Sequence, residues 1–198
     1  MTVINTTLNH LPPHGVDNAA DNTLRNLLFD YLLNEEEDYS GAARILSGVR
    51  MDGDGEEEGS MSVYYMPPID RCDVFVKVAE CYLEEELTVE AEGAVKKAGT
   101  IIEATGISIT SNDNDDDECG GVNNKADELT VTLMLRYKST YARVLDANRK
   151  FLQAAVKYHD LSTAYLHTDA IDADDLLSML GRAVTCAILS PNSAQRQR

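Results

Sequence analysis

Two acidic runs, at 52–58 and 113–118, are the stretches of this sequence that most invite a metal-binding hypothesis. A calcium-binding EF-hand loop needs oxygen ligands at its first, third and fifth positions. It also needs Gly at the sixth position for a sharp turn and Glu at the twelfth to bind the ion with both oxygens. Counted from Asp113, the sixth residue is Glu118 and the twelfth is Asn124. Counted from Asp52, they are Glu57 and Val63, so neither run has the required Gly and Glu. We therefore interpret both runs as solvated acidic segments.

The histidines do not have the spacing of a zinc site. His10 and His14 lie in a polar, proline-containing N-terminal stretch where no helix is expected, and His159 and His167 are eight residues apart. Helical zinc ligands are placed one turn apart or within an HExxH motif. A metallo-isopeptidase would need an HxH pair, which the sequence lacks. We predict no metal site.

Cys119 is the candidate thiol nucleophile, but it follows four acidic residues, and neighbouring carboxylates disfavour the reactive thiolate. Cys72, Cys81 and Cys186 fall within apolar helical patterns, where a free cysteine behaves as a small buried hydrophobe. The four cysteines form no CxxC pair, which favours a reducing compartment. The GxSxG, GxxxxGK[ST] and GxGxxG motifs are absent. We predict no catalytic residue, no cofactor and no cofactor-binding residue.

The elements around these residues repeat. The segments 29–43 and 141–155 share one frame, with an aromatic residue, an apolar pair, a second aromatic residue and a final Ala-Ala at matching positions. A weaker copy lies at 79–91. Each copy has the pattern of an apolar helix end, a short polar turn and a second helix that opens on small residues. This pattern is typical of stacked helical hairpins.

The sequence therefore predicts an all-α fold, a TPR-like right-handed solenoid of antiparallel helical hairpins. Ala42, Ala91 and Ala154 fall early in the second helix of each pair, where a larger side chain would hold the partner helix away. A chain of this kind most often presents surfaces to partner proteins. Which residues would form such an interaction surface is not determined by the pattern.

The expected helices begin near residue 22 and cover 42–46, 69–85, 89–104, 128–148, 151–165 and 172–189. The segment 69–85 has a competing strand interpretation, because Val74, Val76 and Val78 alternate. Residues 1–21 are expected to be a loose lead-in and 22–198 a helical-repeat domain. Acidic, disordered insertions are predicted at 51–66 and 107–127.

Charge and hydropathy restrict the classes of partner. The net charge is −17, of which the two acidic runs contribute ten negative charges. Since no stripe of Lys and Arg is present, direct nucleic-acid binding is not expected. No apolar stretch approaches 18 residues, and the N-terminus lacks the pattern of a secretory signal. The sequence predicts a soluble intracellular protein with no membrane contact.

Three segments carry a resemblance to a known family. They are VFVKVAECYLEEE (74–86), RYKSTYARVLDANRKFLQAAVKYHDLS (136–162) and AVTCAILSPNSAQRQR (183–198). The second resembles the helical-repeat region of the subunit 4 family of the COP9 signalosome, and the other two follow the same order at compatible spacing. The resemblance extends over about residues 22–198 and depends on the ordered combination, because each motif alone is ordinary hairpin sequence.

The resemblance implies a non-catalytic scaffold subunit in the cytoplasm and nucleus. Its implied partners are the other signalosome subunits and a cullin–RING ubiquitin ligase. In this family a helical solenoid is followed by a PCI domain. The complex removes Nedd8 from cullins, and its zinc active site lies on another subunit. This chain departs from the family in its acidic insertions. It also ends at Arg198, where the family continues into the PCI module, so that module is expected to be missing.

Two alternatives share the predicted architecture. One is the paralogous scaffold subunit of the proteasome regulatory lid. The other is a free-standing TPR-like adaptor that binds peptide tails through converging cations, for which Lys77, Arg136, Lys138 and Arg143 are the candidates. The order of motifs in 136–162 favours the signalosome over the lid.

Overall fold

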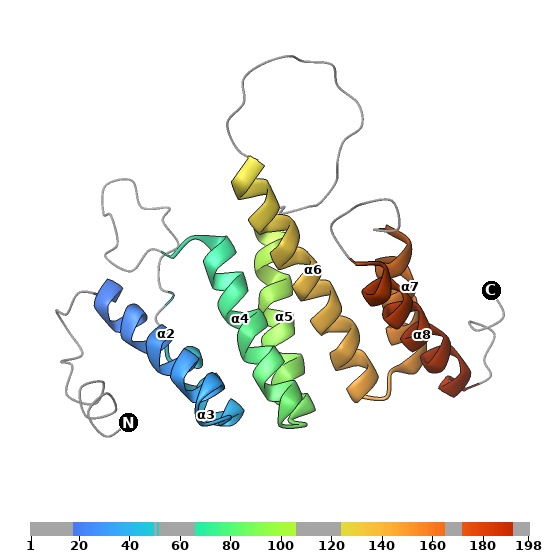
Figure 1. Cartoon of the computed structure of the whole chain (residues 1–198), viewed down its shortest axis with the longest axis horizontal. Helices are drawn as coiled ribbons and strands as arrows, with labels where there is room; N and C mark the ends of the chain where they lie inside the picture. The colour runs from blue at the N-terminus through green and yellow to red at the C-terminus, as the bar shows by residue number, and fades with distance from the viewer. Residues whose placement is uncertain (1–17, 50, 52–65, 106–123, 165–171, 192–198) are drawn as a thin grey trace, which may run out of the picture.

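The computed structural model of this chain describes residues 18–49, 51, 66–105, 124–164 and 172–191, and all regular structure in these ranges is α-helical (Figure 1). The helices are α2 (Asn18–Asn34), α3 (Tyr39–Ser47), α4 (Pro68–Glu84), α5 (Thr88–Thr105), α6 (Asn124–Ala147), α7 (Phe151–Ala164) and α8 (Ala173–Leu189). The all-α class predicted from the sequence is confirmed.

The helices pack in the order of the chain. Each helix contacts the next one, and α6 contacts both α4 and α5. Figure 1 shows the result as a row that runs from α2 and α3 at one end to α7 and α8 at the other. One apolar core joins α2 through α6, and a second joins α6, α7 and α8. Each pair of helices therefore buries its apolar face against its neighbours in the row.

Three helix–turn–helix units share the frame seen in the sequence. In each unit one non-glycine residue of the turn has a left-handed backbone: φ is 52° at Glu37, 58° at Glu86 and 58° at Arg149. Left-handed residues commonly end helices, although glycine is the usual choice. Each of the three lies five residues before the alanine at the matching position of its unit, which is Ala42, Ala91 or Ala154. The turns therefore match in position as well as in conformation.

The alanines of the three units have the same surroundings. Ala42, Ala91 and Ala154 each have an exposed fraction of 0%. The N–H of each donates to the carbonyl oxygen four residues earlier, at 3.0 Å in every case. A methyl side chain at this point lets the second helix approach the first closely, as the sequence predicted.

The helical interpretation of the 69–85 segment is confirmed, because it lies in α4. Val74, Val76 and Val78 are all buried, with exposed fractions of 8%, 0% and 3%. Alternating valines in a strand would point to opposite faces. Here they are all covered because α4 has neighbours on several sides, namely α3, α5 and α6.

Two helices start earlier than expected. Helix α2 begins at Asn18, inside the range 1–21 predicted as a loose lead-in, and α6 begins at Asn124, inside the predicted insertion 107–127. Both starts consist of polar residues and alanines, which carry no clear apolar period from which a helix could be recognised. The remaining residues of these ranges, 1–17 and 107–123, lie outside the described residues.

The insertion predicted at 51–66 is not solvated at its two ends. Met51 and Met66 are partly buried and pack against the core that joins α2 through α6. The chain leaves α3 and enters α4 beside this core, so two long apolar side chains are within reach of it. Residues 52–65 lie outside the described residues, and their interpretation as an acidic insertion stays a prediction.

Candidate functional site

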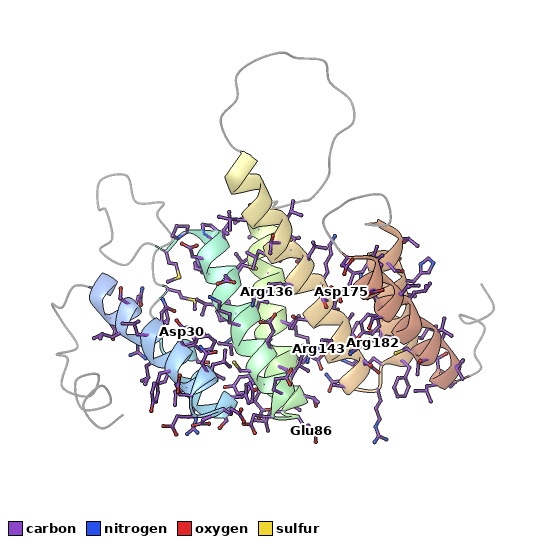
Figure 2. All side chains as sticks on the ribbon, in the orientation of Figure 1. Asp30, Glu86, Arg136, Arg143, Asp175 and Arg182 are labelled. Carbon is purple, nitrogen blue, oxygen red and sulfur yellow. The ribbon has the colours of Figure 1, made fainter. Side chains whose placement is uncertain are left out.

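A groove lies on the surface formed by α2, α3, α4 and α6, with a volume of about 370 Å³. We call it the α4 groove. Its apolar lining includes Phe29, Leu33 and Tyr39, which belong to the same core that holds the first two units together. Its polar lining includes Asp30, Glu80, Glu84, Lys77 and Arg136. Figure 2 shows Asp30 on α2 and Arg136 on α6, on either side of α4.

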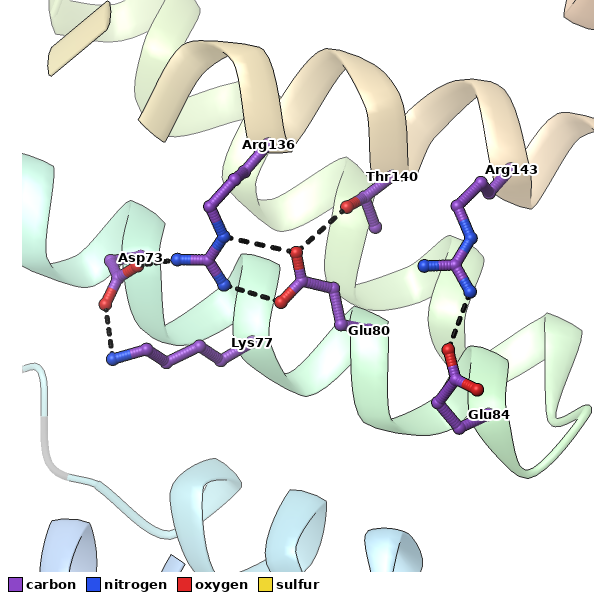
Figure 3. Close-up of polar contacts among 7 residues, drawn as sticks. All are labelled: Asp73, Lys77, Glu80, Glu84, Arg136, Thr140 and Arg143. Atoms are coloured by element: carbon purple, nitrogen blue, oxygen red, sulfur yellow. Dashed lines mark hydrogen bonds and ion pairs between the residues drawn. The ribbon is translucent and has the colours of Figure 1, made fainter. Parts of the chain in front are cut away.

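Arg136 is the centre of a charged network between α4 and α6 (Figure 3). Its guanidinium donates to Asp73 at 2.9 Å and to both carboxylate oxygens of Glu80, at 2.5 and 3.3 Å. The hydroxyl of Thr140, which is buried, also donates to Glu80 at 3.3 Å. Lys77 pairs with the second oxygen of Asp73 at 2.8 Å. The network therefore uses two cations and two carboxylates to join two helices.

The network keeps Arg136 charged. Partial burial acts to lower the pKa of Arg136, but the hydrogen bonds and negative charges of Glu80 and Asp73 outweigh burial and raise the pKa above its ordinary value. Two carboxylates on one guanidinium form charge-assisted hydrogen bonds, which are stronger than neutral ones. The group is a fixed structural cation and has no proton to give at neutral pH.

The same contacts bear on the adaptor interpretation, which needs converging cations that are free to hold a peptide tail. Lys77 and Arg136 are paired within the network, and Arg143 pairs with Glu84 at 2.7 Å. Lys138 lines a different groove. Three of the four candidate cations are therefore already neutralised by carboxylates of α4, which argues against a clamp for acidic tails.

A second polar cluster joins α5 to the turn between α6 and α7. Glu92 accepts hydrogen bonds from Lys150 at 2.8 Å and from Asn148 at 2.9 Å, and it pairs with Lys96 at 2.9 Å. The hydrogen bonds from Lys150 and Lys96 lower the pKa of Glu92 from its ordinary value. This cluster positions the turn of the third unit against the second.

A further groove, of about 510 Å³, is lined by residues of α5, α6 and α7, and it continues into one of about 460 Å³ that shares Tyr141 and Lys157. The rings of Tyr137 and Tyr141, which both line the larger groove, stack with centroids 6.2 Å apart and planes 11° apart. Burial raises the pKa of Tyr137 to about 12. Its hydroxyl is therefore neutral at physiological pH and suited to packing or hydrogen bonding.

The described cysteines have unreactive thiols. Cys72, Cys81 and Cys186 are free and buried, as predicted. Burial raises the pKa of each thiol to about 11. Since the thiolate is the nucleophile, these groups are unreactive at neutral pH. Cys119, the candidate nucleophile of the sequence analysis, lies outside the described residues.

The histidine and acidic candidates can be followed only in part. His159 is exposed, and its Nδ1 lies 3.9 Å from Asp160. His10, His14, His167 and both acidic runs lie outside the described residues. Among the residues that the structure does describe, no three His, Cys, Asp or Glu side chains gather as a metal ion would require. Within the same ranges, no helix has the length and apolar character needed to cross a bilayer.

The sequence did not predict the network around Arg136, although a signal for it exists. Arg136 and Asp73 are 63 residues apart, the same separation that relates Ala154 to Ala91. Equivalent positions of successive units come side by side when the units stack. Opposite charges at equivalent positions were therefore a usable sign of an ion pair between α4 and α6.

Comparisons with curated proteins agree on one kind of relative. The chain is 32% identical over 170 residues to COP9 signalosome complex subunit 4 of Arabidopsis thaliana, which covers 84% of this chain and 35% of the relative. It is 28% identical over 178 residues to the protein of the same name in Emericella nidulans, covering 90% of this chain and 35% of the relative. For the Drosophila melanogaster protein the identity is 25% over 167 residues, with 84% and 32% covered.

The chain thus spans about a third of the length of the curated relatives it matches. No protein-family model matches it. The aligned regions cover most of this chain. They leave about two thirds of each relative without a counterpart here.

Proposed function

This chain is a partial homologue of COP9 signalosome subunit 4, and from this premise we propose that it is a non-catalytic scaffold subunit of that complex. The observation that carries the proposal is the match across 84% of the chain to a protein named as a subunit of this complex. The proposal includes a location in the cytoplasm and nucleus, where it supports removal of Nedd8 from cullin–RING ubiquitin ligases. Its partners are the other subunits and the ligase, with no direct contact to nucleic acid or membrane.

The arrangement of the helices supports this role. Three units with matching turns and buried alanines, packed in chain order, are what a TPR-like right-handed solenoid requires. We include that solenoid in the proposal, as a domain over 22–198 that carries the two acidic insertions. Such a fold offers long helical faces to several partners at once, which suits a subunit that holds others in place.

The chemistry of the described residues also supports a non-enzymatic role. Arg136, Arg143 and Lys150 are used in ion pairs between segments of the row, and burial raises the pKa of the described thiols. The ion pairs hold the helices together. The raised pKa values leave no activated thiol among Cys72, Cys81 and Cys186. The proposal assigns the zinc chemistry of deneddylation to another subunit.

The test is affinity purification of the tagged natural gene product from its own cells, followed by quantitative mass spectrometry. We expect the signalosome subunits to be recovered in near-equal amounts, and the fraction of Nedd8-modified cullin to rise when the protein is depleted. A matched control is the Leu46→Asp variant, which places a carboxylate at a fully buried site and is expected to prevent folding. Recovery of proteasome lid subunits would overturn the proposal, and recovery of acidic-tailed client proteins alone would favour the adaptor.

A further inference from the structure

Two of the three turns in the row carry the same run of acids. Residues 35–37 and 84–86 are each three consecutive glutamates, and they occupy matching positions before Ala42 and Ala91. All six side chains are exposed. We call these two runs the acidic turns. At the matching positions of the third unit, 147–149, the sequence is Ala-Asn-Arg. The acids are therefore not a requirement of the turn itself.

The acidic turns are unfavourable for the helices that they end. Each follows the C-terminal end of a helix, α2 or α4, and neither helix has a basic residue in its last turn. The C-terminal end of a helix carries a partial negative charge, which favours cations and disfavours carboxylates. Glu37 and Glu86 also have the left-handed backbone for which glycine is the usual choice. Fold stability does not account for these glutamates, and local rules are broken mostly at functional sites.

Few of these carboxylates are neutralised within the fold. Glu84 pairs with Arg143 at 2.7 Å, and Glu36 accepts a hydrogen bond from Tyr31 at 2.9 Å. The other four glutamates take part in no ion pair within the described ranges. The hydrogen bond to Glu36, together with the negative charges of Glu36 and Glu35, raises the pKa of Tyr31 above its ordinary value. This edge of the row therefore has a negative potential that cations would relieve.

The α4 groove opens between the acidic turns. Asn34, which directly precedes the first run, and Glu84, the first residue of the second run, both line it. Figure 2 shows Glu86 beyond the end of α4, at the lower edge of the row. The apolar lining of the groove includes Leu33 and Tyr39, which are only partly buried. An apolar side chain of a ligand can therefore enter the groove while its neighbours meet the glutamates.

The cations in the groove do not oppose a basic ligand. Lys77 pairs with Asp73, and Arg136 binds both Asp73 and Glu80. Asp30 adds an exposed carboxylate to the lining. The groove and the acidic turns together therefore favour a ligand with positive charge.

Other occupants fit these charges less well. A second copy of this chain would bring a net charge of −17 to an acidic surface. The cations of its third turn are Arg149 and Lys150, and Lys150 is already paired with Glu92 at 2.8 Å. Nucleic acid and anionic membranes would be repelled as well. A basic segment of another protein is the occupant that charge complementarity selects.

We propose that the α4 groove and the acidic turns together bind a basic segment of a partner protein. An apolar side chain of this segment enters the groove beside Leu33 and Tyr39, and Lys or Arg residues on either side of it bind the glutamates of the two turns. The inference deepens the proposed scaffold role and rests on that role only for the source of the segment, which would be a protein of the same assembly.

The test selects ligands for the purified full chain from a phage-displayed library of random short peptides. The dissociation constant of the selected peptide is then measured by fluorescence anisotropy. We expect the selected sequences to carry an apolar residue flanked by Lys or Arg. Replacing the apolar residue by Ser, or the flanking cations by Gln, should each weaken binding at least about tenfold, because the first removes the anchor and the second removes the charges.

On the protein side, Glu35→Lys combined with Glu85→Lys should also weaken binding at least about tenfold, because like charges repel across an interface. Both residues are exposed, so the fold should be unaffected, and circular dichroism checks this. The matched control is Glu103→Lys combined with Asp160→Lys. It makes the same change in net charge at exposed residues of the groove lined by α5, α6 and α7, and it should leave the dissociation constant nearly unchanged.

Four results would overturn the proposal. They are equal losses of affinity in the two double variants, selection of acidic or uncharged peptides, selection of no peptide, and self-association of the parent chain that Glu35→Lys with Glu85→Lys abolishes in sedimentation equilibrium. The last result would assign the groove to a second copy of the chain.

The scaffold role is measured separately, by affinity purification of the tagged parent chain from its own cells. Recovery of signalosome subunits without a selected basic peptide would reject the α4 groove as a binding site and leave the scaffold role intact. A selected peptide that the variants map to the groove, without recovery of those subunits, would reject the scaffold role and leave the binding site.

Discussion

Arg136 and Asp73 occupy equivalent positions in two successive units, and their side chains meet at 2.9 Å. The pair is extended by Glu80, which lies two turns after Asp73 on α4 and binds the same guanidinium. Stacking brings equivalent positions together. Arg136 of α6 therefore lies beside α4, where its guanidinium binds both Asp73 and Glu80. This contact fixes the register of α6 on α4.

Arg136→Met should lower the free energy of unfolding by about 1–2 kcal/mol. This value lies between the losses typical of exposed and of buried ion pairs, because the paired side chains are about one third exposed. The change leaves Asp73 and Glu80 without their shared cation. The loss is measured by urea unfolding, with circular dichroism as the signal. Arg143→Met is the control, because its single ion pair with Glu84 is more exposed and should be worth less than about 1 kcal/mol. Equal losses for the two variants would contradict a special role for Arg136.

Glu86→Gly should stabilise the chain by about 0.5–1 kcal/mol. Glu86 has φ of 58°, a conformation that costs an L-residue about 1–2 kcal/mol and costs glycine little, while glycine loses somewhat more entropy on folding. Thermal and urea unfolding measure the change. At the neighbouring Glu85, where φ is −89°, the same substitution has no strain to relieve and should destabilise by about 0.5–1 kcal/mol. A loss of stability in both variants would show that the left-handed turn is not strained.

Ala154→Leu should cost about 1–3 kcal/mol, because Ala154 is fully buried where α7 meets α6 and the added atoms have no space. The melting temperature reports the loss. On the same helix, Val156→Leu changes a half-exposed side chain and should stay within about 0.5 kcal/mol of the parent. A neutral Ala154→Leu would mean that the helices are not held at close approach.

The stability difference between the parent and Glu92→Gln should shrink as the solution is acidified. Hydrogen bonds from Lys150 and Lys96 lower the pKa of Glu92 below its value in the unfolded chain, about 4.3. The unfolded chain therefore binds the proton first. The contribution of Glu92 is complete above that value and is lost as the pH falls through the lowered pKa. Unfolding curves from pH 7 to pH 3 measure this, with Glu90→Gln as the control for removing one negative charge from α5. A difference that is constant over this range would contradict the prediction.

Much of the fold could be predicted because it depends on short-range patterns. The shared frame identified the three turns and placed Ala42, Ala91 and Ala154 at buried positions. The helix expected over 172–189 is also present, and it begins at the cap Asp172, whose carboxylate accepts the N–H of Ala173 at 2.8 Å. The starts of α2 and α6 were missed since polar residues and single alanines give no clear apolar period.

The sequence analysis did not predict the contacts between helices, although the shared frame offered a sign of the pair between Arg136 and Asp73. The partners of Arg136 are 56 and 63 residues away, and only the packing of α6 on α4 decides that both carboxylates reach one guanidinium. Likewise, the sequence analysis did not assign the apolar residues of α8 to separate faces. The structure divides them into a buried face and an exposed one, because α6 and α7 cover only one side.

The equal spacing between each left-handed turn residue and its alanine makes the row sensitive to length. One additional residue between Glu86 and Ala91 would rotate the start of α5 by about 100°. Ala91 would then turn towards water, and a bulkier neighbour would be driven into the contact with α4. Because every later helix is placed by the one before it, the error would be carried along the row to α8. Single-residue insertions in these three turns should therefore be far more damaging than longer ones elsewhere on the surface.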